Sequence, residues 1–396
     1  MKLYYGKDLS AWNTFGMKVS CACFVEYSSV ARLQEFWKAW RYGEHVLPKP
    51  FLHIGRGSNL LFTGDFPGTV FHSDIKFIRE YGKSREEGDE TAVPRSSEER
   101  PGTAGRPAES SGVVLVEAGA GVLWDDFCRW CADNSLWGPE NLSGIPGETG
   151  AAAVQNIGAY GVEVKDIVRY VKCFDCVTGA AVTFRASECR YGYRDSMFKS
   201  GAKGRYVVTS VVFSLSAVPV PRLGYGHVRA AVEKVLGRPV PDVAGCPAGS
   251  AESSRLPDGL TASMVRDVIL DIRNSKLPDP AVMGSAGSFF KNPVVPRSDY
   301  ERVASVARLE HGMDCEVPHY DAGSGFIKIP AAWLIDQCGL KGFRAGNAGV
   351  YEKQPLVLVN LTGKASPEEI LYLENLVRNA VVNKFGIMLH PEVEHV

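Results

Sequence analysis

The chain has 396 residues, of which 45% are hydrophobic and 22% charged, and its formal net charge is −1 at pH 7. These values are typical of a folded globular protein, and the near-zero charge argues against the basic surface that nucleic acids and anionic membranes attract. The length exceeds what one compact core usually holds, so we expect two or three domains.

The first residues, 1–8, lack the apolar core of a signal peptide, and no apolar run reaches the roughly 20 residues that span a bilayer. We therefore expect a cytoplasmic protein with no membrane insertion and no nucleic-acid partner. The remaining pattern alternates strands and helices without an internal repeat, which predicts a mixed α+β chain.

The first clear strand, residues 50–55, runs into the glycine turn Gly55-Arg56-Gly57-Ser58-Asn59. Leu60 stands where the G-x-G-x-x-G dinucleotide fingerprint has its third glycine, and an apolar strand-like run follows instead of a helix. A Rossmann site is therefore disfavoured. Taken alone, this motif indicates little more than a tight turn.

Two segments differ in composition from the rest of the chain. Residues 81–112 are almost free of large apolar side chains and rich in Glu, Ser, Pro and Gly, and residues 240–260 repeat that bias. Such segments bury too little apolar surface to fold, so both are predicted to be disordered or mobile insertions. Elsewhere, residues 113–118 and 206–215 predict strands, and residues 366–383 predict an amphipathic helix that begins with a serine cap.

The chain contains ten cysteines, and two pairs have the spacing of half a zinc site. Cys128 and Cys131 fall in a predicted amphipathic helix, where positions three apart share a face. Cys173 and Cys176 fall in a predicted strand, where positions three apart point to opposite faces. Neither pair has the glycine-containing knuckle of a zinc ribbon, so we predict buried thiols in a reducing compartment and no metal site.

The most informative segment is Gly144 to Gly161, which holds five glycines among small or neutral side chains. Glycine at this density indicates backbone turns with positive φ or the close approach of another group. Exposed amides in such turns form an anion-binding concavity, for which a diphosphate-bearing cofactor is the expected guest. A mobile surface loop is the alternative, but Ile145, residues 151–154 and Ile157 are side chains that pack. Together with the 55–59 turn, the segment predicts two glycine turns that grip one extended pyrophosphate.

Three later motifs carry candidate chemistry. Arg194, in Tyr191-Gly192-Tyr193-Arg194-Asp195, either holds a carboxylate or pairs with the aspartate beside it. Ser288 lies among glycines and two phenylalanines in residues 284–293, where it is either a capping serine or a positioned proton donor. No Gly-x-Ser-x-Gly elbow surrounds it, which disfavours a hydrolase nucleophile. Glu392 ends an apolar strand, where a lone carboxylate is more often solvated than catalytic.

Together these segments resemble the MurB family of UDP-N-acetylenolpyruvoylglucosamine reductases, flavoproteins of peptidoglycan precursor synthesis. The resemblance covers nearly the whole chain except the two insertions. Leu223-Gly224-Tyr225-Gly226 resembles the tyrosine loop of the family's type I branch. The other matching motifs are Asn13-Thr14-Phe15, the Gly-Ser-Asn turn, Gly144 to Glu163, Gly192 to Ser196, Lys276 to Pro280, Ala286 to Pro293, Trp333 to Gly342 and Pro391-Glu392-Val393.

The resemblance implies an α+β fold of the FAD-linked oxidase (PCMH) type, in which two lobes bind FAD and a third lobe binds the substrate. The implied segments are 1–80 for the first FAD lobe, 81–112 for an insertion, 113–220 for the second FAD lobe, 221–269 for the tyrosine loop and a mobile insertion, 270–384 for the substrate lobe, and 385–396 for a strand that returns to the active site.

The implied reaction has two halves in one site. NADPH reduces FAD, and the flavin then gives hydride to the enolpyruvyl group of UDP-N-acetylglucosamine enolpyruvate, which yields UDP-N-acetylmuramate. By resemblance, Arg194 and Glu392 stabilise the enol-like intermediate, Ser288 delivers the proton, and the enzyme is a monomer.

The resemblance also implies the binding residues. Those for the flavin are Gly55, Arg56, Gly57, Ser58, Asn59, Gly144, Ile145, Pro146, Gly147, Gly150, Ala151, Val154, Ile157 and Gly158. Those for the substrate are Tyr160, Tyr193, Tyr225, Lys276, Asn292 and Gln337. Simple packing is the alternative for the aromatic members of the second set.

The chain departs from the family pattern at four positions. Arg56 stands between two glycines, where its charge either reaches a phosphate or points to solvent. Ala153 replaces a common proline, and His390 replaces a frequent glutamate. Glu148 places a negative charge inside the pyrophosphate loop, where it should be unwelcome unless it turns outward.

Two other functions remain as alternatives to the reductase. One is another FAD-linked oxidase on the same fold that acts on a sugar or lactone. The other is a non-catalytic nucleotide-binding or scaffold protein of a cell-wall assembly. The combination of Arg194, Ser288 and Glu392 with the Trp333–Gly342 motif favours the reductase.

Overall fold

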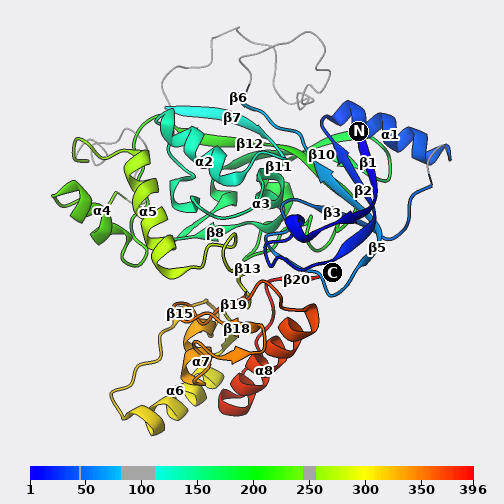
Figure 1. Ribbon diagram of the computed structural model, residues 1–396. Coiled ribbons are helices and arrows are strands. Elements are labelled where there is room, and N and C mark those ends of the chain that lie inside the picture. The colour runs from blue at the N-terminus through cyan, green and yellow to red at the C-terminus, as the bar shows by residue number, and fades with distance from the viewer. Residues whose placement is uncertain (44–45, 82–111, 244–255) are drawn as a thin grey trace. The chain divides into compact units, whose positions relative to one another are not determined.

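The computed structural model describes residues 1–43, 46–81, 112–243 and 256–396 (Figure 1). The two predicted insertions, 81–112 and 240–260, lie outside the described residues except at their edges. Contacts group the described chain into two compact units, each assembled from three segments. Unit 1 comprises Met1–Tyr5, Cys23–Gly55 and Gly68–Arg273, and unit 2 comprises Gly6–Ala22, Arg56–Pro67 and Asn274–Val396.

The first sheet belongs mostly to unit 1 and has four strands in the order β1-β2-β5-β3. Its strands are β1 (Lys2–Asp8), β2 (Ser20–Tyr27), β3 (Phe51–Ile54) and β5 (Phe66–Ser73). Strand β3, predicted from residues 50–55, is confirmed and pairs in parallel with β5. Helix α1 (Val30–Arg41), capped by Ser29, adds the buried Leu33 and Phe36 to the apolar cluster of this sheet.

The second sheet of unit 1 is antiparallel, with five strands in the order β11-β10-β12-β7-β6 (Figure 1). Its strands are β6 (Ile78–Glu80), β7 (Val113–Gly119), β10 (Val168–Asp175), β11 (Ala181–Arg185) and β12 (Tyr206–Ser216). The sequence correctly predicted β7 and β12. Helices α2 (Trp124–Asp133) and α3 (Thr149–Gln155) contribute to its core, where the Phe127 and Phe213 ring centroids are 4.5 Å apart.

The two cysteine pairs belong to the elements around this core. Cys128, Cys131 and Cys173 are buried free thiols, as predicted, and Cys176 is half-buried just beyond the end of β10. Burial raises the pKa of the Cys176 thiol to about 11. Among the described residues, no group of three or more His, Cys, Asp or Glu side chains is arranged to hold a metal ion.

The remaining elements of unit 1 are a hairpin, three 3-10 turns and two helices. They are the hairpin β8 (Gly158–Ala159) and β9 (Val162–Glu163), the 3-10 turns η2 (Glu140–Leu142), η3 (Val164–Asp166) and η4 (Ala186–Cys189), and the helices α4 (Val228–Leu236) and α5 (Ala262–Lys276), which extends three residues into unit 2. Helices α4 and α5 form a separate apolar cluster around Val232, Val265 and Ile269.

Unit 2 is built from three small sheets and three helices. The first sheet contains β13 (Gly284–Ser288), β17 (Arg344–Ala345), β18 (Ala348–Val350) and β19 (Val357–Asn360). The second contains β14 (Val294–Pro296), β15 (Tyr320–Asp321) and β16 (Phe326–Lys328). The third pairs β4 (Leu60–Leu61) with β20 (Glu394–His395). The helices are α6 (Arg297–His311), α7 (Ala331–Gln337) and α8 (Pro367–Phe385). Unit 2 also contains the 3-10 turn η1 (Ser10–Trp12).

Helix α8 confirms the prediction made from residues 366–383. Ser366 and Glu369 form a capping box at its start, in which each side chain accepts a hydrogen bond from the other residue's backbone. The helix ends at Phe385, where Gly386 takes φ +69°. Its buried face includes Ile370, Leu373, Glu374, Val377, Val381 and Phe385.

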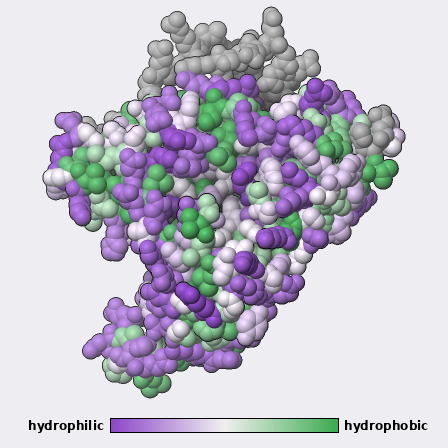
Figure 2. Space-filling view, viewed as in Figure 1, coloured by the Kyte–Doolittle hydropathy of each residue, from purple (hydrophilic) through white to green (hydrophobic). Residues whose placement is uncertain are grey.

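The surface of the molecule mixes hydrophilic and hydrophobic residues in small patches on the face shown in Figure 2. In the parts of the chain that the structure describes, every helix is too short or too polar to cross a membrane.

Candidate active site

The segment that begins at Gly144 is an ordered, packed turn. The Gly144 amide donates to Asp125 Oδ1 at 2.6 Å, and the Gly147 carbonyl accepts from the Trp124 amide at 3.0 Å. Helix α3 follows at once, and its Gly150 amide donates to the Ala120 carbonyl at 3.0 Å. These bonds tie the segment to α2 and to the residue that follows β7, and they argue against the alternative of a mobile loop.

Glu148 lies inside this turn and points inward, although the sequence indicated that a negative charge there would be unwelcome unless it turned outward. Its side chain is 4% exposed, and Oε1 lies 3.0 Å from Nε2 of the equally buried His72. The other ring nitrogen of His72, Nδ1, lies 3.5 Å from Glu26 Oε2. A Cβ built on Gly55 would lie 3.1 Å from Glu148 Oε2, so the carboxylate sits beside the glycine that follows β3. The inward turn is possible because a histidine, which the sequence pattern did not single out, lies between two carboxylates.

Arg194 lies in a tight turn closed by hydrogen bonds in both directions between Gly192 and Asp195. Its φ of +55° is rare for a side chain other than glycine and indicates local strain. The guanidinium donates to the Gly158 carbonyl and lies 5.5 Å from the centre of the Tyr193 ring. A Cβ on Gly158 would lie 2.6 Å from Arg194 Nη1, so glycine at that position makes room for the guanidinium.

Tyr160 and Gly161 form the two-residue turn between β8 and β9, both with positive φ, of +48° and +80°. Such a turn favours glycine or asparagine, so the tyrosine is held there under strain. Tyr225 packs on the turn, because a Cβ on Gly161 would lie 3.1 Å from Tyr225 Cβ. Asn141 joins the two segments by donating to the carbonyls of Tyr160 at 3.0 Å and Arg222 at 2.7 Å.

Two arginines of α5 hold the same region, and no sequence motif pointed to them. Arg273 donates to the Gly144 carbonyl at 3.0 Å and hydrogen-bonds Tyr160, while burial raises the pKa of that tyrosine. Arg266 makes a two-pronged ion pair with Asp125, at 2.6 and 2.8 Å, beside the Gly144 amide. Because both partners lie more than 100 positions from α5, no local pattern could reveal them.

In unit 2, the 55–59 turn packs against the segment before Thr14. Gly57 has φ +63°, and a Cβ there would lie 2.1 Å from the Trp12 carbonyl oxygen. The Gly57 carbonyl accepts from the amide of Thr14, at 3.4 Å. Arg56 is exposed and lies over the Trp12 ring, 5.4 Å from its centre.

The segments that carry Ser288 and Glu392 pair directly. The Glu392 amide donates to the Phe289 carbonyl at 2.8 Å, and the Lys291 amide donates to the His390 carbonyl at 2.9 Å. Asn59 Nδ2 donates to the Glu392 carbonyl at 3.1 Å, which joins the glycine turn to the same place. Ser288 is exposed at the end of β13 and is not tucked among its apolar neighbours as its sequence context suggested.

Three predicted substrate residues lie further along unit 2. Asn292 Oδ1 accepts the amide of Ala331 at 2.9 Å, so it caps the start of α7. Gln337 is the last residue of α7, and its carbonyl accepts from Lys384 at 2.6 Å. Lys276 is exposed at the end of α5. Asn292 and Gln337 therefore lie at opposite ends of one helix, and their described contacts do not gather these residues at one point.

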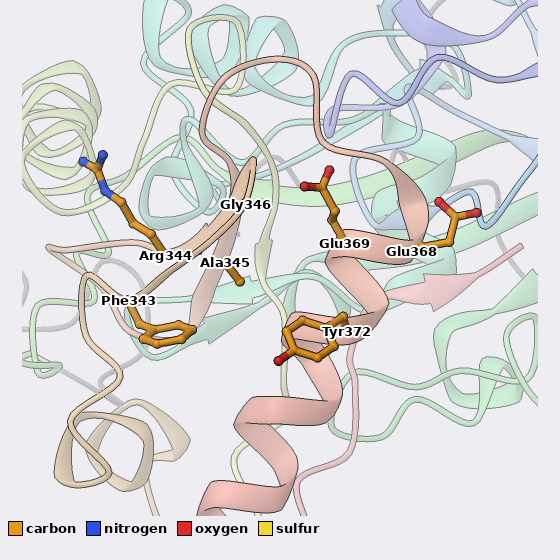
Figure 3. Close-up of a pocket in the computed structure, with 7 residues that line it drawn as sticks. All are labelled: Phe343, Arg344, Ala345, Gly346, Glu368, Glu369 and Tyr372. Atoms are coloured by element: carbon orange, nitrogen blue, oxygen red, sulfur yellow. The ribbon is translucent and has the colours of Figure 1, made fainter.

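A surface hollow of about 460 Å³ lies at the start of α8 (Figure 3). Its lining residues are Phe343, Arg344, Ala345, Gly346, Glu368, Glu369 and Tyr372. Glu369 is occupied by the capping box and by Asn347, and the rings of Phe343 and Tyr372 stand across the hollow from each other in Figure 3. Tyr372 is twelve residues from Lys384, about 18 Å along the helix. The hollow is thus remote from Gln337 and contains no predicted site residue.

Comparisons with known proteins agree on one family. Residues 279–396 match the model of the UDP-N-acetylenolpyruvoylglucosamine reductase C-terminal domain, and residues 111–185 match an FAD-binding domain. A UDP-N-acetylenolpyruvoylglucosamine reductase of Bacteroides fragilis strain YCH46 is 41% identical over 98% of both chains. One from Neisseria meningitidis serogroup A is 39% identical over 98% of this chain and 96% of its own length.

A solved structure supports the fold. The UDP-N-acetylenolpyruvylglucosamine reductase (MurB) from Thermus caldophilus superimposes with a TM-score of 0.57 and 20% identity, covering 100% of this chain and 98% of that chain.

Proposed function

Because this chain belongs to the family of UDP-N-acetylenolpyruvoylglucosamine reductases, we propose that Arg194, Ser288 and Glu392 are its catalytic residues. The enzyme is an FAD-dependent oxidoreductase that uses NADPH to reduce UDP-N-acetylglucosamine enolpyruvate to UDP-N-acetylmuramate for peptidoglycan synthesis. FAD, when bound, accepts hydride from NADPH and supplies it to the enolpyruvyl methylene carbon.

The residues of the 55–59 turn fit a flavin diphosphate. The buried Thr14 Oγ1, beside Gly57, has no hydrogen-bond partner among the described residues, as expected of a group that awaits a ligand. The side chains of Ser58 and Asn59 add neutral polar groups on the same turn. We assign Gly55 to Asn59 and the Gly144–Gly158 segment, with the residues named above, to the flavin.

The pairing of the Glu392 amide with the Phe289 carbonyl is the observation that carries the catalytic assignment. It supports placing the Glu392 carboxyl and the Ser288 hydroxyl in one site. Addition of hydride at the methylene carbon moves negative charge onto the α-carbon and its carboxylate, which fixed donors must stabilise. The planar guanidinium of Arg194 suits that carboxylate through a two-pronged contact.

Ser288 would deliver the final proton to the α-carbon. A serine hydroxyl is a weak acid, so it donates usefully only to a strongly basic carbon from which water is kept away. Glu392 lies beside the developing charge. Because two bare carboxylates repel, we infer that Glu392 holds a proton or orients a donor in the reacting complex.

For the substrate we propose Tyr160, Tyr193, Tyr225, Lys276, Asn292 and Gln337. The strained turn at Tyr160 and the exposure of Tyr193 and Tyr225, 38% and 46%, support their use as contact surfaces. Lys276 suits the diphosphate as a point charge. With Asn292 Oδ1 committed to α7, its amide NH2 is the group left to donate to a ligand.

We further propose the domain boundaries given above, a monomeric enzyme and a cytoplasmic location. The nine described cysteines are all free thiols, which supports a reducing compartment. Size measurement of the FAD-loaded protein by light scattering tests the monomer.

The visible spectrum of the purified protein, recorded without oxygen, tests the function. We expect a yellow protein that NADPH bleaches and that UDP-N-acetylglucosamine enolpyruvate then recolours. Bleaching without recolouring by that substrate would favour an oxidase for another sugar or lactone. A colourless protein, even after addition of FAD, would contradict the assignment of the glycine turns.

A further inference from the structure

Glu374 is a buried carboxylate to which the proposed reaction gives no part. It lies on α8, and its side chain is 3% exposed. Oε2 lies 3.1 Å from Nε2 of His395, and Oε1 lies 3.5 Å from Nη1 of Arg378. Because a buried carboxylate without a charged partner is costly, these two contacts strongly favour keeping His395 against the helix.

His395 belongs to β20, three positions after Glu392. Its ring centroid lies 6.1 Å from that of Phe289. Phe289 in turn follows Ser288 in the chain and accepts the Glu392 amide at 2.8 Å. The histidine therefore contacts both the α8 carboxylate and the residue that joins the two proposed catalytic segments.

Backbone hydrogen bonds hold this part of the chain to β4 and to the residues after Ser288, but none of those described reaches α8. Strand β20 pairs with β4 over two residues on each side, Glu394 with Leu60 and His395 with Leu61. A ladder this short is only marginally stable by itself. Val396 adds two bonds, since its amide donates to the Leu61 carbonyl at 2.9 Å and its carbonyl accepts from the Thr63 amide at 2.7 Å. Residues 390 and 392 make one backbone bond each, to Lys291 and Phe289 just after the Ser288 strand. An anchoring side chain beyond the ladder thus has a clear physical role.

We propose that Glu374 and His395 are a positioning pair that holds the Glu392 segment against the Ser288 strand. The inference rests on the proposed roles of Ser288 and Glu392. In this assignment neither member of the pair touches substrate or flavin, and both act through the backbone of residues 389–392. Their chemistry is that of an ion pair when His395 is protonated and of a hydrogen bond when it is neutral.

The first experiment measures the two half-reactions separately on FAD-loaded protein, by stopped flow without oxygen. Glu374→Gln and His395→Gln should each keep flavin reduction by NADPH within about twofold of the parent. Each should lower the limiting rate of flavin reoxidation by substrate about tenfold. The double variant should be no slower than either single variant, because both substitutions remove the same interaction.

Matched controls share the same elements. Glu368→Gln removes a carboxylate from the exposed first turn of α8, and His390→Gln removes an exposed imidazole two positions before Glu392. Both should leave the two half-reactions unchanged.

A second readout does not depend on turnover. Amide hydrogen exchange of the peptide covering residues 389–396 should be faster in Glu374→Gln and His395→Gln, while the first turns of α8 exchange as in the parent. This measurement tests the anchoring even if the proposed catalytic roles are wrong.

The outcomes separate cleanly. Unchanged exchange in both variants, together with reoxidation within about twofold of the parent, would overturn the positioning pair. Equal loss of both half-reactions would also overturn it and leave a purely structural role. If Ser288→Ala and Glu392→Gln, run in the same series, leave reoxidation unchanged, the proposed function fails, and the exchange data alone then decide the anchoring.

Discussion

His72 lies between the carboxylates of Glu26 and Glu148 in the interior of unit 1, next to a segment that we propose for flavin binding. Glu26 has a second partner, because Lys2 Nζ lies 3.1 Å from its Oε1. Glu148 depends more directly on His72. Its Oε1 has the His72 ring as its partner in the interior, so removal of the ring leaves the Glu148 carboxylate buried without that contact.

Replacement of His72 should therefore destabilise the protein through Glu148. We expect His72→Leu to lower the free energy of unfolding by about 3 kcal/mol or more and to reduce flavin content, because a buried carboxylate loses its partner. Urea unfolding and the flavin absorbance measure the two effects. The double variant His72→Leu/Glu148→Gln should recover part of the stability, and a double variant as unstable as the single one would contradict this explanation.

His53 gives the protein a predictable acid sensitivity. Its ring stacks on Phe71 at 4.8 Å, and its buried Nδ1 has no hydrogen-bond partner among the described residues. Burial lowers the pKa of His53 from 6.5 to about 4. Between these values the unfolded chain binds a proton that the folded chain does not. Stability should therefore be lost as the pH falls from about 6.5 to about 4, by at most about 3 kcal/mol.

The variant His53→Leu tests this acid sensitivity. We expect the free energy of unfolding to fall less steeply between pH 6.5 and 4 in His53→Leu than in the parent. The exposed His390→Gln should keep the parent's slope. Parallel curves for the parent and His53→Leu would show that other groups cause the acid response.

Ser288→Ala separates the two half-reactions. Ser288 is exposed at the end of β13, so its loss should not disturb packing. We expect flavin reduction by NADPH to persist and reoxidation by substrate to fall by about two orders of magnitude or more, as loss of a positioned proton donor does. Rapid-mixing absorbance follows both steps. Equal loss of the two rates would reject the role assigned to this hydroxyl.

At the scale of elements, the 55–59 turn depends on its second glycine. Gly57→Ala would place a Cβ 2.1 Å from the Trp12 carbonyl at a φ of +63°. The new Cβ is fixed to the Gly57 backbone and the oxygen belongs to the Trp12 backbone, so the 55–59 turn and the Trp12 segment must move apart. We expect a loss of more than about 2 kcal/mol and reduced flavin content. Gly64→Ala, which meets nothing within 4 Å, is the control and should behave as the parent.

Local sequence patterns predicted the elements that neighbouring residues in the chain determine. Alternation predicted β7 and β12, and the Ser366 cap with apolar spacing predicted α8 to within two residues of its end. The inward turn of Glu148 could not be predicted, since its partner His72 lies 76 positions away. The bond from Arg273 to Gly144 and the pairing of β20 with β4 could not be predicted either, because their partners are also far apart in the sequence. Sequence motifs identified the candidate residues. Their hydrogen-bond and ion-pair partners are distant in the sequence, so no local pattern could identify them.

At the scale of the molecule, the chain passes between its two units repeatedly. Unit 2 takes residues 6–22 and 56–67 from the N-terminal part, and the contacts are specific. Asn360 Nδ2 donates to the Phe15 carbonyl at 3.0 Å, and the Ser285 amide donates to the Thr14 carbonyl at 2.9 Å. This grouping differs from the contiguous segments expected from the sequence, and those domain boundaries stay a prediction.

The insertion at 81–112 should be dispensable. Strands β6 and β7, which flank it, are antiparallel neighbours with Glu80 opposite Val116, and the Tyr81 amide donates to the Leu115 carbonyl at 2.8 Å. A short turn can therefore join them. Deletion of residues 83–110 should leave turnover and flavin content as in the parent, measured side by side. A collapse of flavin content would show that this segment serves the cofactor.

The pairing of β4 with β20 also determines when this part of the protein can fold during its synthesis. Asn59 and its partner Glu392 are 333 positions apart. At ribosomal rates of roughly 5–20 residues per second, roughly 15 to 70 seconds pass between the synthesis of one and the other. During that interval residues 60–61 lack their partner strand, because the sheet that contains β4 consists of β4 and β20. This part of unit 2 can therefore reach its final arrangement only after the Glu392 segment has been made.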